Sequence, residues 1–153
     1  MGRCKKGIVV WIVMVVLMLC QSSVCFAGSG TDTSNWVTFT KKYIESSSGT
    51  YRYIESRTKA RTTDSASLRI SHVYDNELVE RTSSWVKCKV KIRNGSSYTS
   101  STAYSDMVYA YFGETTDIPL YKSARAANTK LYLFGIGNSS DYAAYISGKL
   151  IVY

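Results

Sequence analysis

The sequence is short of cysteine and histidine, and each shortage narrows the possible classes of protein. Three of its four cysteines lie within the first 25 residues, so a chain that loses its N-terminal segment keeps only Cys88. A secreted domain with a single thiol has no internal disulfide framework. The only histidine, His72, needs carboxylate partners to bind a metal ion, and no spacing suggests them. We therefore expect no disulfide scaffold, no metal centre and no cofactor.

Patterns typical of catalysis are missing as well. No serine stands in a nucleophile-elbow pattern. His72 shares the predicted face of a strand with Leu68 and Ile70, which favours a half-buried structural side chain over a general base. Two carboxylates brought together by the fold can still form a glycosidase-like pair, so a small secreted hydrolase remains an alternative to our expectation of a non-enzyme. The acidic residues lie scattered in or near predicted turns: Asp75, Glu77, Glu80, Asp106, Glu114, Asp117 and Asp141.

The N-terminal residues have the pattern of a targeting signal. Three cations precede an unbroken apolar run at residues 8–20, which is short for a membrane span and typical of a signal-peptide core. Cys25 and Ala27 then supply small residues at the −3 and −1 positions of a cleavage site. The pattern predicts cleavage before Gly28.

Cleavage at this point divides the chain into a signal peptide at residues 1–27 and a single secreted β domain at residues 28–153. The alternative is an uncleaved anchor, which residues 8–27 are just long enough to form. On cleavage, Lys plus Arg falls from 19 to 16 against 11 acidic residues, so the net charge falls from +8 to +5. A positive surplus of this kind favours binding to anionic surfaces.

The remaining chain favours strands over helices. No window shows a stripe with a 3.6-residue period, and threonine, tyrosine and valine dominate, as they do on half-buried pleated surfaces. About six to eight short strands with Gly, Ser and Asn turns predict an all-β fold, a small antiparallel β-sandwich or a jelly-roll-like domain. The predicted strands cover residues 36–40, 50–54, 68–74, 85–93, 107–112, 117–121, 130–136 and 142–153.

The segments between these strands carry their own expectations. Residues 57–67 have no apolar side chain larger than alanine and are interpreted as an extended or looped segment. Residues 123–128 can hold one helical turn at most. Pro119 indicates an edge strand or a bend. Residues 137–141 are a predicted hairpin loop, and Asn94-Gly95 is predicted to supply the positive φ angles of a tight turn.

The strand at residues 85–93 shows the clearest pattern, a strict alternation of aliphatic and cationic side chains. A period of two puts the aliphatic set on one face and the cationic set on the other, with cations about every 6.5–7 Å. This spacing suits a polyanion with regular charges, such as a teichoic acid. The alternative is a solvated face that protects a sheet edge. The predicted anion-binding residues are Lys87, Lys89, Lys91 and Arg93, and the cations that enlarge the patch if their strands lie alongside are Arg52, Arg57, Lys59, Arg61 and Arg69.

Two further features concern the same region. Cys88 lies on the aliphatic face, which favours a small buried hydrophobic side chain, with an intermolecular disulfide as the alternative. Tyr109 and Tyr111 share one face of their predicted strand and form a candidate aromatic platform for sugars or peptides. Tyrosine is also a common strand residue with no binding role, which is the simpler interpretation of the 13 tyrosines.

Residues 57–70 combine an Arg-x-Lys stretch with a Ser/Thr patch before a strand, and residues 142–148 form a tyrosine-rich segment that ends in Ser-Gly. In these two stretches the sequence resembles short, uncharacterised secreted proteins of Gram-positive bacteria, some of which are discussed beside lactococcin-like bacteriocins. The resemblance implies a secreted, non-catalytic β domain of Firmicute type. The ending at residues 149–153 departs from the Trp-Ser-Pro-Asp type expected of such proteins, so no functional residue is carried over.

The sequence therefore predicts a secreted, non-catalytic β-sandwich that associates with the cell envelope or another anionic extracellular surface. An anionic wall polymer is the expected partner, without nucleic acid and without stable membrane insertion after cleavage. A secreted bacteriocin-like effector is the second hypothesis, and a small secreted hydrolase is the third.

Overall fold

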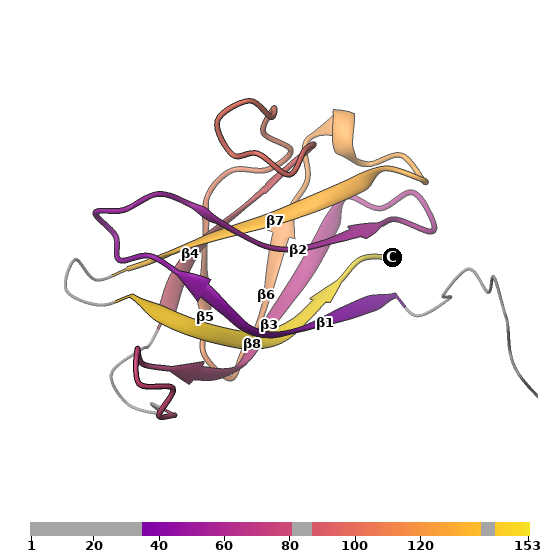
Figure 1. Cartoon of the computed structure of the whole chain (residues 1–153). Coiled ribbons are helices and arrows are strands. Elements are labelled where there is room, and N and C mark those ends of the chain that lie inside the picture. The colour runs from indigo at the N-terminus through magenta and orange to yellow at the C-terminus, as the bar shows by residue number, and fades with distance from the viewer. Residues whose placement is uncertain (1–34, 81–86, 139–142) are drawn as a thin grey trace, which may run out of the picture. The chain divides into compact units, whose positions relative to one another are not determined.

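The computed structural model describes residues 35–80, 87–138 and 143–153, and its described strands form an antiparallel β-sandwich (Figure 1). The strands are β1 (Trp36–Ile44), β2 (Arg52–Thr58), β3 (Ser65–Tyr74), β4 (Lys87–Arg93), β5 (Val108–Tyr111), β6 (Thr115–Pro119), β7 (Lys130–Gly137) and β8 (Ala144–Ile151), with a short 3₁₀ helix, η1 (Lys122–Ala124). The predicted all-β fold is confirmed. All eight described strands lie within the compact unit Ser34–Tyr153.

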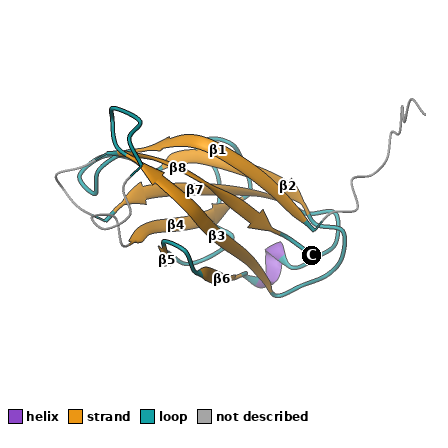
Figure 2. Cartoon of the chain, turned by 90° about the horizontal axis from the view of Figure 1, so that it is seen from below, coloured by secondary structure: helices purple, strands orange, loops and turns teal. Residues whose placement is uncertain are grey.

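The strands form two four-stranded sheets. Sheet A has the order β1-β8-β3-β6, and sheet B has the order β2-β7-β4-β5 (Figure 2). Consecutive strands change sheet at every connection except the one from β4 to β5. The predicted hairpin between the last two strands is therefore wrong, because β7 lies in sheet B and β8 in sheet A. Short-range turn signals identify a connection but not the sheet in which the next strand pairs.

The core consists of the inward-facing aliphatic side chains of both sheets. Each sheet contributes alternate residues, as a half-buried strand requires. Sheet A supplies Phe39, Ile44, Leu68, Ile70, Val73, Ile118, Ile146 and Leu150, and sheet B supplies Ile54, Cys88, Val90, Ile92, Ala110, Leu131 and Leu133.

The predicted connections agree with the observed ones only in part. Residues 57–67, predicted as an extended or looped segment, begin within β2, form a loop and end within β3. Asn94 and Gly95 do not adopt positive φ angles, and the chain instead makes a wide loop at residues 94–107 before β5. Pro119 does end an edge strand, since β6 pairs only with β3 in sheet A.

The predicted half-buried position of His72 is wrong. The pairing of β3 with β8 shifts register between Ile70 and His72, and this bulge moves the following side chains to the opposite faces. Val73 therefore enters the core, whereas His72 is exposed. Its Nδ1 atom lies 2.6 Å from Oε1 of Glu80, which is also exposed.

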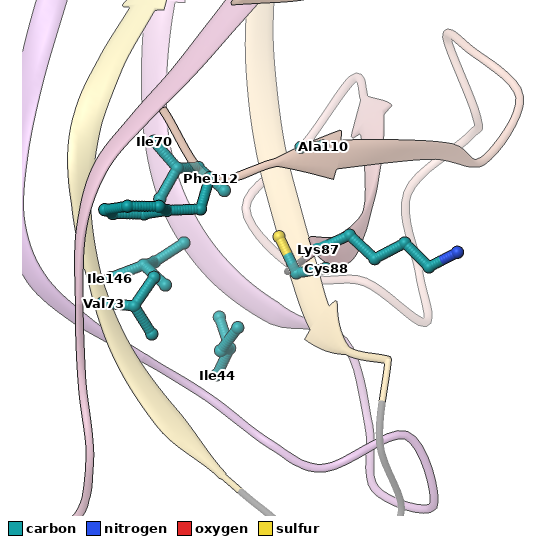
Figure 3. A pocket seen from close by; sticks show the side chains of 8 residues that line it. All are labelled: Ile44, Ile70, Val73, Lys87, Cys88, Ala110, Phe112 and Ile146. Atoms are coloured by element: carbon teal, nitrogen blue, oxygen red, sulfur yellow. The ribbon is translucent and has the colours of Figure 1, made fainter. Parts of the chain in front are cut away.

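Cys88 is buried, as expected, and it is a free thiol. Burial raises the pKa of this thiol to about 12. Its side chain borders a small apolar cavity, and Figure 3 shows the Lys87 ammonium pointing away from the other side chains that line it. The cavity has a volume of about 10 Å³, which leaves room for one water molecule at most. It is a packing gap in the core, too small for an organic ligand.

Candidate functional site

The predicted cationic ladder lies on the outer face of sheet B. Along β4, Cys88, Val90 and Ile92 are buried in the core, and Lys87, Lys89, Lys91 and Arg93 between them are partly exposed on the opposite face. The alternation read from the sequence is therefore correct for residues 87–93, and residues 85 and 86 lie outside the described part of the chain. β4 pairs with β5 on one side and β7 on the other, so these lysines do not protect a sheet edge.

The predicted tyrosine platform lies beside this ladder. Lys87 pairs in register with Tyr111, and Lys89 pairs with Tyr109, which brings all four side chains to one face. The Lys87 ammonium lies 4.4 Å from the ring centroid of Tyr109 and 5.7 Å from that of Tyr111. These are cation–π distances. Two features that the sequence offers separately thus form one surface.

On the other side of β4, the cations face apolar side chains of β7. Lys91 pairs with Phe134, and Arg93 pairs with Tyr132. Phe134 is only 2% exposed, although it projects from the outer face of the sheet and is not part of the core cluster. Other side chains must therefore cover it.

Three tyrosines from outside β4 and β7 supply this cover. The ring of Tyr98, from the wide loop at residues 94–107, meets Phe134 edge-on at a centroid distance of 5.5 Å, and Tyr53 of β2 does so at 6.0 Å. Tyr51 stacks on Tyr98 with ring centroids 4.6 Å apart. Burial, followed by the neighbouring Tyr98, raises the pKa of Tyr51. The outer face thus carries a second, smaller apolar layer.

Arg93 holds the wide loop against this layer. Its guanidinium lies 4.5 Å from the ring centroid of Tyr98, Nε donates to Oγ of Ser101 at 2.8 Å, and a terminal nitrogen donates to the Ser101 carbonyl. Two of the five donors of Arg93 are therefore used to hold this loop. The three lysines of the ladder form no ion pair with a carboxylate in residues 35–80, 87–138 or 143–153.

The suggested enlargement of the patch is wrong in two positions. Lys59 is only 1% exposed, and Arg69 belongs to sheet A on the other side of the sandwich. Arg52 does belong to sheet B, but its guanidinium forms an ion pair with Glu45. The order of the strands in each sheet determines which cations lie together on one face, and the sequence does not reveal that order.

Sequence reasoning missed the aromatic part of this site. Tyr51, Tyr53, Tyr98 and Phe134 lie in three separate segments that only the pairing of β7 with β2 and β4 brings together. The one available signal was Tyr98, a large ring within a stretch of serines and threonines.

Among the described residues, no group of three or more His, Cys, Asp or Glu side chains is placed to hold a metal ion, and no helix is long and apolar enough to cross a membrane. The His72–Glu80 pair is about half exposed on each side and lies near Tyr74. The feature that distinguishes this chain is the lysine and tyrosine surface of sheet B. Comparison of the chain with protein-family models, with curated proteins and with solved structures finds no match in any of the three.

Proposed function

We propose that this protein is a secreted, non-catalytic domain that binds an anionic polymer of the cell envelope through the outer face of sheet B. The observation that carries the proposal is the pairing of each ladder lysine with an apolar or aromatic side chain on a neighbouring strand. Lys87 and Lys89 face the tyrosines of β5, and Lys91 faces Phe134 of β7.

This pairing supports binding in two ways. The aliphatic stem of a lysine beside a ring keeps its apolar part covered while its ammonium stays in water. The lysine heads are therefore held at strand spacing and remain free of carboxylate partners among the described residues. Tyr109 and Tyr111, each more than a third exposed, add flat apolar area with a polar tip beside these charges.

A polymer that alternates sugars or polyols with anionic groups matches this surface. Its anionic groups would meet ammonium groups about 6.5–7 Å apart along β4, and its carbon-rich units would lie on the tyrosines of β5. The net charge of +5 expected after signal cleavage adds long-range attraction to a negatively charged wall. The N-terminal signal pattern and the resemblance to secreted Gram-positive proteins support the same location.

The test is co-sedimentation of the domain at residues 28–153 with purified Gram-positive walls, with and without teichoic acid, at low and high salt. We expect binding that requires the polymer and falls steeply as salt rises. The double variant Lys89→Glu/Lys91→Glu should abolish it.

The matched control is Arg69→Glu/Lys149→Glu, which changes the net charge by the same amount. Arg69 and Lys149 are exposed and pair in register on β3 and β8 of sheet A. This variant should keep most of the binding. Equal loss in both double variants would show attraction by net charge alone and would overturn the site. Absence of wall binding in every condition, together with growth inhibition of related strains by the pure protein, would favour the bacteriocin-like alternative.

A further inference from the structure

A second candidate site lies apart from the lysine and tyrosine surface, in the loop between β2 and β3. An open groove of about 670 Å³ is bordered there by two arginines, three hydroxyl side chains, a carboxylate and a tyrosine ring. Its volume is within the range of small-molecule sites. The lining residues are Arg61, Thr62, Thr63, Asp64, Ser65, Arg125 and Tyr153.

A buried lysine joins the two sides of this groove. The Nζ atom of Lys59 donates to the carbonyl oxygens of Thr63, Ala124 and Arg125 at 2.7, 3.1 and 2.6 Å. Its three N–H groups are thus all used, and none goes to a carboxylate. The ammonium thus ties the loop between β2 and β3 at Thr63 to the segment at Ala124 and Arg125. The Thr63 amide also donates to the Arg125 carbonyl at 3.1 Å.

The side chains that line the groove carry a net positive charge. Burial, followed by the charge of Arg125, lowers the pKa of Lys59, whereas the charge of Asp64 raises it. Among the side chains, the guanidinium groups of Arg61 and Arg125, with the Lys59 ammonium near Arg125, outnumber the carboxylate of Asp64. A site with this balance attracts an anion.

The two guanidinium groups are positioned by the protein and still carry free donors. Arg125 uses its Nε to donate to the Leu120 carbonyl at 2.9 Å, which leaves its two terminal nitrogens for a ligand. Arg61 lies over the ring of Tyr153, with its Cζ 5.3 Å from the centroid, and forms no ion pair within the described residues. Guanidinium groups of this kind bind phosphate oxygens in pairs.

We infer that this groove binds a small phosphorylated polyol or sugar. The phosphate would accept hydrogen bonds from Arg61, Arg125 and the hydroxyls of Thr62 and Ser65, and Asp64 would accept one from a hydroxyl group of the ligand. The assignment does not depend on the outer face of sheet B, because the two sites share no residue.

The test is titration of the ¹⁵N-labelled domain at residues 28–153 with inorganic phosphate, glycerol 3-phosphate, glycerol and acetate, read by amide chemical shifts. We expect saturable shifts confined to the amides of residues 61–65 and 125 with the two phosphates, tighter binding of glycerol 3-phosphate, and no saturation with glycerol or acetate. Arg61→Gln and Arg125→Gln should each weaken phosphate binding by about tenfold.

Two further variants make the test specific. Asp64→Ala should remove the preference for glycerol 3-phosphate over phosphate, because it removes the acceptor that only the polyol needs. Lys89→Glu/Lys91→Glu should leave the titration unchanged. Shifts that do not saturate, that acetate reproduces, or that spread over sheet B would overturn the site. The wall-binding assay can fail while this titration succeeds, so the two proposals are tested separately.

Discussion

Lys91 and Phe134 are register partners on β4 and β7, so a partly exposed lysine lies directly beside a ring that is almost completely shielded from water. The shield consists of tyrosines that β4 and β7 do not supply. The outer face of sheet B is therefore stabilised by ring contacts of its own, separately from the core between the sheets. This separation allows the two layers to be tested one at a time.

Tyr98→Ala should destabilise the domain by about 2 kcal/mol, because it removes ring contacts to Phe134 and Tyr51 and uncovers an apolar face. Urea denaturation gives the change in the free energy of unfolding, and binding of a hydrophobic dye to the native state reports the uncovered ring. Tyr98→Phe keeps the ring and should stay within about 0.5 kcal/mol of the unmodified domain. Equal losses in both variants would contradict a role for the ring itself.

Lys59→Met should be among the most destabilising single substitutions of a lysine in this chain. The methionine fills much the same space but leaves the Thr63 and Ala124 carbonyls without their donor and the Arg125 carbonyl with the Thr63 amide alone, which costs about 3 kcal/mol in total. Lys122→Met is the control, because that side chain is exposed at the start of η1, and a change within about 0.5 kcal/mol is expected. A small effect at Lys59, measured by urea denaturation, would mean that water replaces the ammonium.

The Cys88 thiol should be unreactive in the folded domain. A pKa of about 12 leaves almost no thiolate at neutral pH, and the side chain is 3% exposed. Alkylation by iodoacetamide should therefore proceed only at the rate of unfolding and should become fast in concentrated guanidinium chloride. Rapid labelling under native conditions, or a disulfide-linked dimer in the purified protein, would contradict the buried position.

The turn between β1 and β2 should weaken in acid. The Thr50 amide and the Arg52 guanidinium both donate to the Glu45 carboxylate and lower its pKa from the usual 4.5. A carboxyl with a lowered pKa contributes stability that is present above 4.5 and is lost as the pH falls through the pKa of the folded state. Urea denaturation across this range should show the decline, and Glu45→Gln should show less of it. Parallel pH profiles for both proteins would assign the acid sensitivity to other groups.

Local patterns account for what the sequence predicted correctly. Alternation in residues 87–93 needs only the period of a strand, so the faces of Lys89 and Cys88 could be assigned without knowing the neighbouring strands. Proline lacks the N–H group that a central strand needs, so it favours an edge strand, and Pro119 does lie at the end of the edge strand β6.

Long-range pairing and register account for what it did not predict. The bulge between Ile70 and His72 leaves no clear mark in the sequence, yet it reverses the faces of the residues that follow. Lys59 lies in a polar stretch typical of a solvated loop, and its burial depends on carbonyls of η1 far along the chain. The placement of Phe134 beside Lys91 likewise follows from strand order alone.

The position of β8 in sheet A has a consequence for when the protein can fold. β8 lies between β1 and β3, so these two strands have no partner on that side until residues 144–151 are present. Contacts between such distant segments make folding slow, on the order of milliseconds to seconds. A chain leaving the ribosome thus cannot complete sheet A until residues 144–151 have emerged, after the other described strands have been made.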